Sequence, residues 1–171
     1  MKLHNNPARD KWKEICKRPE VDYKSMENTI SIVFDEIKSM GDRAVKKNTR
    51  QFDQVELDFI QVSEIEFQEA DKKVTRQLKN AIDIAKNNIE KFHASQKEEV
   101  KFIDTIPGVT CWRESRAIEK VGLYVPGGTA PLFSTVLMLG IPAKLAGCKE
   151  IIICTPPQKD GTIHAAILYT A

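Results

Sequence analysis

The sequence has no long apolar run and no paired cysteines, and each absence excludes a class of protein. Lys144 interrupts the longest apolar stretch, so no segment reaches the roughly 18 consecutive apolar residues of a membrane-spanning helix. The first residues lack the apolar stretch of a secretory signal. The cysteines are scattered without a C-x-x-C pair, at Cys16, Cys111, Cys148 and Cys154. These observations predict a cytoplasmic protein with free thiols and no membrane contact.

The sequence also has no large excess of positive or negative charge. The 26 Lys and Arg residues nearly balance the 24 Asp and Glu residues, so no basic surface for nucleic acid is predicted. A hydrophobic content of 42% and a charged content of 29% are ordinary for a soluble globular protein. At 171 residues the chain can form one domain with a core, or a small domain and part of another.

Residue patterns for catalysis and metal binding are also missing. His4, His93 and His164 lie far apart, and none has a second ligand at helical spacing. His93 follows Phe92 on a predicted helix, and we interpret it as a packing or surface residue. Cys154 ends a predicted strand with no activating group near it in the sequence, which favours an inert buried thiol. We predict no catalytic residue and no metal ligand in this chain.

Residues 1–20 are predicted to form an N-terminal arm. Trp12, Ile15 and Cys16 can share one face of a short helix. So few apolar residues cannot form a core by themselves. The arm must therefore dock on the rest of the chain or on a second subunit.

Residues 21–120 are predicted to form the helical and β part of the first domain. An amphipathic helix starts at Ser25 and ends at Gly41, and its apolar face carries Ile30, Val33, Phe34 and Ile37. Asp42 can cap a second helix. The inner side of that second helix is predicted to carry Val45 and Phe52.

Two further helices follow in this region. Ser63-x-x-Glu66 is a capping box for a short helix, and Thr75 can start a long one. A narrow apolar stripe on the long helix is typical of a helix that packs along a sheet or another helix. The stripe consists of Leu78, Ile82, Ala85, Ile89 and Phe92.

Strand-like segments lie on either side of the long helix. Residues 55–62 are predicted to be a strand or an extended segment. Near residue 100 two strand-like runs flank Pro107-Gly108, which predicts a turn between two strands. Phe102 and Trp112 are then expected to pack against each other across the strands.

Residues 121–157 contain a strand, a Gly-rich turn, a helix and a second strand in order. Val121–Val125 and Ile151–Cys154 are short apolar runs of the kind found in buried strands. Between them, Pro131 in the first turn, Ser134 as a cap and Gly147 as a stop delimit a helix. The pattern predicts parallel strands with the helix crossing one face. The expected fold class is α/β, with N-terminal helices and a small β region followed by an incomplete Rossmann-like β-α-β unit.

The loop Pro126-Gly127-Gly128-Thr129-Ala130-Pro131 is the candidate binding segment. Adjacent glycines let a ligand approach the backbone, and a helix start favours an anion. The spacing is neither G-x-G-x-x-G nor a P-loop, so a tight structural turn remains an equal alternative. Tyr124 has two interpretations as well. It is either a half-buried strand aromatic or a ring and hydroxyl presented to a nucleotide.

These same residues carry a family resemblance. GLYVPGGTAPLFSTVLMLGIPAKLAGCKEIIICTPP, which ends at Pro157, resembles the corresponding stretch of the histidinol dehydrogenase family. Three upstream segments resemble that family in order and spacing, namely GDRAVKKNTRQFD, KNAIDIAKNNIEKFHASQK and PGVTCWRESRAIEKVGLYVPGG. The resemblance spans nearly the whole chain.

The resemblance implies an NAD-dependent, zinc-requiring homodimer that oxidises L-histidinol to L-histidine, the last step of histidine biosynthesis. It also implies an aldehyde-dehydrogenase-like architecture. The family's tyrosine that contacts NAD matches Tyr124, and Gly127 and Gly128 follow it in the motif. The family's zinc ligands, acid/base pair and most substrate contacts lie beyond the matched part. No residue of this chain inherits those roles, so the resemblance implies an inactive isolated chain.

The last residues predict a helix that has only begun. Ile163, Ala166, Ile167 and Thr170 follow a turn at Asp160-Gly161 and have helical spacing, yet no stop signal follows. One β-α-β unit also leaves open sheet edges. We therefore expect residues 121–171 to be the truncated start of a nucleotide-binding domain, in a longer protein or in a paired copy. Two alternatives remain, a non-catalytic dimerisation module and a small nucleotide- or phosphate-binding protein.

Overall fold

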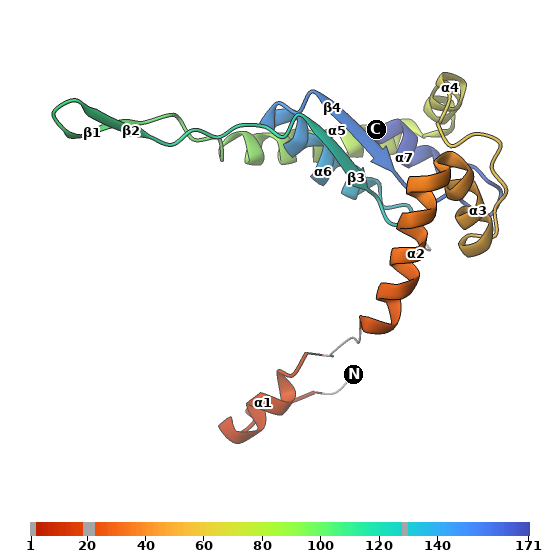
Figure 1. Ribbon diagram of the computed structural model, residues 1–171, viewed down its shortest axis with the longest axis horizontal. Coiled ribbons are helices and arrows are strands. Elements are labelled where there is room, and N and C mark those ends of the chain that lie inside the picture. The colour runs from red at the N-terminus through yellow and green to blue at the C-terminus, as the bar shows by residue number, and fades with distance from the viewer. Residues whose placement is uncertain (1–2, 19–22, 128–129) are drawn as a thin grey trace. The chain divides into compact units, whose positions relative to one another are not determined.

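Helices and two small pairs of strands make up a mixed α/β structure in the computed structural model, which describes residues 3–18, 23–127 and 130–171 (Figure 1). The chain divides after Ala44 into two compact units, residues 1–44 and residues 45–171. Each unit is described by itself.

The first unit is helical. A short helical segment comprises η1 (Arg9–Lys11) and α1 (Trp12–Ile15). The Trp12 indole N–H donates to the Pro7 carbonyl oxygen over 2.9 Å, which fixes the ring locally. The longer helix α2 (Lys24–Met40) ends at Gly41, as predicted. Its apolar face is open, because Ile30, Phe34 and Ile37 are all exposed.

In the order of the chain, the other elements are α3 (Asp42–Phe52), α4 (Glu64–Lys73), α5 (Arg76–Ala94), β1 (Phe102–Ile106), β2 (Val109–Trp112), β3 (Lys120–Tyr124), α6 (Phe133–Ala146), β4 (Glu150–Cys154) and α7 (Ala165–Thr170). One prediction near α3 is wrong. Phe52 is 56% exposed, because it is the last residue of the helix, next to the turn into the following loop. Residues 55–62, predicted to be a strand or an extended segment, form that loop without a strand, and Val55 is buried.

Local capping signals set the starts of α4 and α5. The Ser63 backbone N–H donates to a Glu66 carboxylate oxygen over 2.8 Å, and the Glu66 N–H donates to Ser63 Oγ over 3.4 Å. This reciprocal pair is the predicted capping box. Thr75 Oγ1 accepts from the Leu78 N–H at the start of α5, also as predicted. Both starts are thus determined within one helical turn of sequence.

The long helix α5 packs along α6. Leu78, Ile82, Ala85 and Ile89 of the predicted stripe are buried or half-buried. Phe92 is 63% exposed, which contradicts the prediction. The apolar stripe of α5 extends beyond the part that α6 covers, because α5 has 19 residues and α6 has 14. The Phe92 ring instead lies edge-on to His93 at 5.3 Å between centroids.

A second set of contacts joins α4, α5 and α7. Helix α4 packs against α7. Lys79 of α5 forms an ion pair with Asp71 of α4 at 2.7 Å. The same ammonium group lies 5.0 Å from the ring centroid of Tyr169 in α7. Lys79 therefore links its own helix, α5, to both α4 and α7.

Strands β1 and β2 form the predicted antiparallel hairpin, with Phe102 opposite Trp112. The two rings lie 5.6 Å apart between centroids, which confirms the expected cross-strand packing. Every residue of both strands is exposed. The hairpin therefore buries little in this chain.

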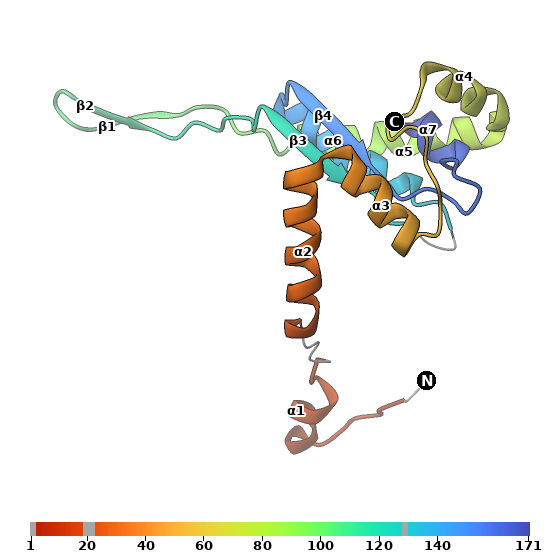
Figure 2. The same ribbon diagram turned by 45° about the vertical axis from the view of Figure 1, so that its right-hand side comes forward.

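Strands β3 and β4 are parallel, and α6 packs against both, as the β-α-β pattern predicted. Figures 1 and 2 show α5 and α6 together on one side of this strand pair. Residues on that side, including Leu123 and Ile153, are half-buried, and those on the other side are exposed. The sheet thus has one covered face and one open face.

The ends of α6 were only partly predicted. Gly147 follows the helix with φ of +90°, so the predicted stop is confirmed. The predicted start is wrong, because the helix begins at Phe133. Pro131 therefore precedes it, and Ser134 lies inside the first turn, where it cannot cap. Leu132 occupies the cap position without a side-chain hydrogen bond, and the helix continues through Pro142.

The core lies where the parallel strands meet the helices. Val125, Val136 and Ile167 form it, and Phe133, Ile153 and Ile163 pack around them. It joins the end of β3 to α6 and to α7, the helix predicted from the last residues. The loops that follow β3 and β4 are therefore anchored at their bases.

Candidate functional site

A hollow of about 200 Å³ lies at the carboxyl ends of β3 and β4. Its walls come from the loop after β3, the loop after β4 and the start of α7. The lining residues are Pro126, Gly127, Ala130, Pro131, Thr155, Pro156, Pro157, Gln158, Ile163, His164 and Ile167. In open α/β sheets, this edge is where ligands bind.

Strand register brings the two loops together. Tyr124 pairs with Cys154, and the Val125 N–H donates to the Cys154 carbonyl oxygen over 2.8 Å. Both chains therefore leave the sheet at the same level. Gly127 then packs so closely against Pro156 that a Cβ on Gly127 would lie 2.6 Å from Pro156 Cγ. The hollow exists in this form because position 127 has no side chain.

This contact gives Gly127 a structural role whether or not a ligand binds. The glycine lets the Pro156 ring reach the backbone of the neighbouring loop. Gly128, the second predicted site glycine, lies outside the described residues, as does Thr129. The described part of the site thus consists of the two ends of the first loop and the whole of the second.

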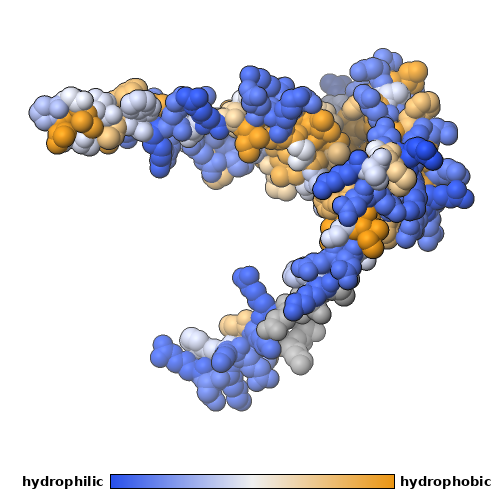
Figure 3. All heavy atoms as spheres, viewed as in Figure 1, coloured by the Kyte–Doolittle hydropathy of each residue, from blue (hydrophilic) through white to orange (hydrophobic). Residues whose placement is uncertain are grey.

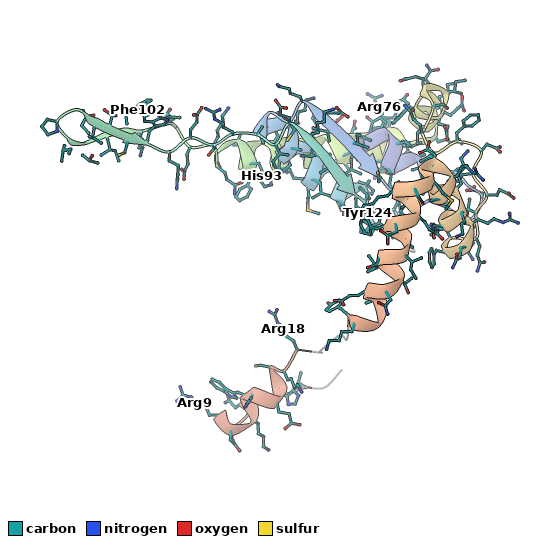
Figure 4. The ribbon with its side chains drawn as sticks, in the orientation of Figure 1. Arg9, Arg18, Arg76, His93, Phe102 and Tyr124 are labelled. Atoms are coloured by element: carbon teal, nitrogen blue, oxygen red, sulfur yellow. The ribbon has the colours of Figure 1, made fainter. Side chains whose placement is uncertain are left out.

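Tyr124 lies at the end of β3 and is 62% exposed (Figure 4). It belongs to the open face of the sheet, beside Gly122, Ile152 and Cys154. Its ring and hydroxyl are accessible, although it does not line the hollow itself. The next residue, Val125, is fully buried, so the backbone of Tyr124 is held next to the core while its side chain is exposed.

His164 is the site residue that sequence reasoning missed. Its Nδ1 accepts a hydrogen bond from the Ala166 N–H over 3.1 Å, which makes it the N-cap of α7. It also lines the hollow. Histidine is not among the preferred N-cap residues, so its place just before a predicted helix was the only signal.

The segment before His164 is held by a local turn. Asp160 Oδ1 accepts from the Thr162 N–H over 3.0 Å and from the Thr162 hydroxyl over 2.8 Å. These bonds lower the pKa of the Asp160 carboxyl, the backbone bond having the larger effect. The turn is therefore built around an ionised Asp160.

The other titratable candidates do not form a centre. In residues 3–18, 23–127 and 130–171, no group of three or more His, Cys, Asp or Glu side chains could hold a metal ion. His93 Nδ1 lies 2.7 Å from Gln96 Oε1, near the end of α5 (Figure 4). The prediction of a buried thiol at Cys154 is wrong, because this free cysteine lies on the open face of the sheet and is exposed. Among the described helices, none is long and apolar enough to cross a membrane.

Comparison with known proteins identifies the family. A protein-family model described as histidinol dehydrogenase matches residues 16–171. The chain belongs to the histidinol dehydrogenase family. The resemblance found in the sequence motifs is thereby confirmed over most of the chain.

Individual members of the histidinol dehydrogenase family match closely. The enzyme of Bacteroides fragilis is 53% identical over 171 residues, which are 100% of this chain and 40% of the relative. The chloroplastic enzyme of Arabidopsis thaliana is 47% identical over 156 residues, which are 90% of this chain and 33% of the relative.

A solved structure gives the same result. The crystal structure of histidinol dehydrogenase from Elizabethkingia anophelis superimposes with a TM-score of 0.92 and 52% identity. The match covers 97% of this chain and 38% of that protein. The chain thus spans about 40% of the length of the first curated relatives it matches.

Proposed function

We propose that this chain is the N-terminal part of an NAD-dependent, zinc-requiring histidinol dehydrogenase, which oxidises L-histidinol to L-histidine. The observation that supports this most is the family match together with a hollow at the carboxyl ends of parallel strands. In this proposal the enzyme is a cytoplasmic homodimer. Residues 1–20 form its N-terminal arm, and residues 21–120 form the helical and β part of its first domain. Residues 121–171 begin a Rossmann-like nucleotide-binding domain in an aldehyde-dehydrogenase-like architecture.

The hollow fits one part of NAD. Its volume of about 200 Å³ is below the roughly 300–1,000 Å³ typical of sites for whole drug-sized ligands. A phosphate or a ribose can enter it while the rest of the dinucleotide lies outside. Tyr124 would then contact the cofactor from the open face of the sheet, and the loop of Gly127 and Gly128 would approach it closely. When bound, NAD supplies the hydride acceptor.

Zinc does not fit the described residues. No cluster of ligands is present among them, and the proposal assigns no residue of this chain to the metal. The proposal assigns no catalytic acid or base to this chain either. Among the described residues that line the hollow, His164 is the one histidine or carboxylate, and its Nδ1 accepts the bond that caps α7. The role of this chain is therefore to bind and orient the cofactor.

The isolated chain is expected to have no dehydrogenase activity. The test is an assay of the purified 171 residues with L-histidinol, NAD and zinc, following NADH absorbance. Turnover above the blank that persists after metal-free purification would show that the chain contains a complete active site.

Tyr124 is tested in a complete enzyme. A chimera would carry this chain in place of the matching part of the Bacteroides fragilis relative. Tyr124→Ala is expected to raise the KM for NAD about tenfold with a smaller change in kcat, because a binding contact is lost. Tyr23→Ala is the matched control, since Tyr23 is an exposed tyrosine of the first unit. An unchanged KM for NAD removes Tyr124 from the site.

One observation favours a dimerisation module as a second candidate. The apolar face of α2 is exposed at Ile30, Phe34 and Ile37, and an open face of this kind is typical of an interaction surface. Light scattering of the isolated chain separates the two proposals. A stable dimer without NAD affinity would support the module, and a monomer would not.

A further inference from the structure

We propose that His164 donates a hydrogen bond from its Nε2–H to a phosphate oxygen bound in the hollow. The inference deepens the proposed NAD site and rests on it. Nothing in the family motifs points to this histidine, because it lies outside the strand and Gly-rich loop that carry the resemblance.

The tautomer of His164 follows from its helix cap. Nδ1 accepts the Ala166 N–H over 3.1 Å, and an imidazole nitrogen that accepts cannot carry a hydrogen. The ring hydrogen therefore lies on Nε2. In the described part of the chain, Nε2 has no hydrogen-bond partner, while the ring lines the hollow. Among the described residues no side-chain nitrogen or oxygen is buried without a partner, so this Nε2 is accessible and can donate to a ligand acceptor.

The other described lining residues offer few side-chain donors. Pro126, Pro131, Pro156 and Pro157 have no backbone N–H. Ile163 and Ile167 contribute apolar surface. The side-chain donors that remain are the His164 imidazole, the Thr155 hydroxyl and the Gln158 amide. His164 therefore adds a side-chain donor to the backbone N–H groups that Gly127, Ala130 and Thr155 bring to the same hollow.

The absence of acidic residues favours phosphate over ribose. Ribose hydroxyls in dinucleotide sites are usually bound by an Asp or Glu carboxylate. No carboxylate is among the residues that line the hollow. A phosphate oxygen needs only donors, and an apolar wall strengthens each bond to it. NAD contains a pyrophosphate, and inorganic pyrophosphate presents the same group alone.

The position of His164 is fixed from both sides. Before it, the Asp160–Thr162 turn is closed by two hydrogen bonds, and Ile163 packs on the core. After it, Ala166 and Ile167 are buried. The imidazole is thus held in place before a ligand arrives, which reduces the entropy lost on binding.

The experiment uses the 171-residue chain labelled with ¹⁵N and titrated separately with pyrophosphate and with NAD. Long-range ¹H–¹⁵N spectra of the histidine rings should show the Nε2–H form of His164 and a shift of Nε2 on binding. His164→Asp keeps a helix-capping oxygen but replaces the donor with a negative charge, so the Kd for pyrophosphate should rise at least about tenfold. His164→Asn keeps both a cap and a donor, so its loss should be smaller.

His4→Asp is the charge-matched control, because His4 is exposed in the first unit. Thermal unfolding of each variant checks that α7 remains capped. If NAD binds and Tyr124→Ala weakens it while the His164 ring and both His164 variants show no effect, the inference is wrong and the proposed function stands. If neither ligand produces any shift in the unsubstituted chain, the inference is wrong, and the Tyr124→Ala measurement in the chimera decides the proposed function separately.

Discussion

The distance between the two site loops depends on one missing atom. Gly127 faces Pro156, and a Cβ there would lie 2.6 Å from the proline Cγ. Real Cβ contacts are not that short, so one of the loops would have to move. The shape of the hollow is therefore sensitive to a single methyl group.

Gly127→Ala is expected to destabilise the chain by about 1–3 kcal/mol, the usual cost of overpacking. Thermal unfolding measures this as a lower Tm, and a weaker affinity for NAD should accompany it. Gly122→Ala, in the strand β3 that precedes this loop, is the control, because its added Cβ meets no atom within 4 Å. Equal Tm values for the two variants would contradict the packing at Pro156.

Glu66 makes the stability of α4 depend on pH. The pKa of its carboxyl lies below the ordinary value of 4.5, first because the Ser63 backbone N–H donates to it and then because the Ser63 hydroxyl does. A lowered pKa means that the ionised group favours the folded state. The contribution is complete above pH 4.5 and is lost as the pH falls below it and the carboxyl takes up a proton.

Glu66→Gln tests this linkage. Glutamine can still accept in a capping box but does not titrate. The Tm of the unsubstituted chain should exceed that of the variant at about pH 6, and the difference should shrink at about pH 3. A difference that stays constant over this range would show that the carboxylate charge does not stabilise α4.

At the residue scale, the sequence predicted the features that depend on contacts between residues a few positions apart, such as helix caps. Ser63 and Glu66 contact each other across one helical turn, and so do Thr75 and Leu78, so their caps followed from spacing. The predicted cap at Ser134 was wrong, because it too was inferred from local spacing alone. A cap depends on where the helix begins, and the loop before α6 delays that start to Phe133. His164 was missed because imidazole rarely caps a helix.

Whole elements show a different limit. Helices α2 and α5 have periodic apolar faces, and the hairpin and the β-α-β unit have short apolar runs bounded by turns, and these patterns predicted the elements. The patterns do not show how far the neighbouring element that covers an apolar face extends along it. Phe92 continues the stripe of α5 but lies exposed, since α6 is the shorter helix. Residues 55–62 have a strand-like composition, but a strand needs a neighbour with which to pair.

Two glycines of α6 should respond oppositely to the same change. Gly140 lies inside the helix, and a Cβ there meets no atom within 4 Å, so Gly140→Ala should stabilise by about 0.5–1 kcal/mol. Gly147 has φ of +90°, so Gly147→Ala should destabilise by at least about 1 kcal/mol. Urea unfolding measures both. Effects of the same sign would contradict the assigned end of α6.

At the scale of the molecule, much apolar surface remains uncovered. Tyr124 and Ile152 on the open sheet face are more than half exposed, as are Phe102 and Trp112 on the hairpin. Figure 3 shows hydrophobic residues at the surface around the small parallel sheet and near the hairpin turn. The Elizabethkingia anophelis enzyme has the same fold over this part and is more than twice as long. Under the proposed function, contacts within the complete enzyme cover this surface.

The isolated chain should therefore bind a hydrophobic dye such as ANS and associate as its concentration rises. In the chimera with the Bacteroides fragilis relative, dye binding per molecule should fall, because the added part covers apolar residues. Fluorescence and analytical ultracentrifugation measure the two effects. A strictly monomeric chain that does not bind the dye would mean that these surfaces are stable in water without a partner.

The place of Ile167 in the core affects the order of folding during synthesis. Val125 and Val136 leave the ribosome well before α7, yet their burial is completed by a residue near the end of this stretch. During synthesis, β3, β4 and α6 must wait, with that side of the core unsealed, until α7 emerges. We expect this interval to be the point at which a nascent chain most needs a chaperone.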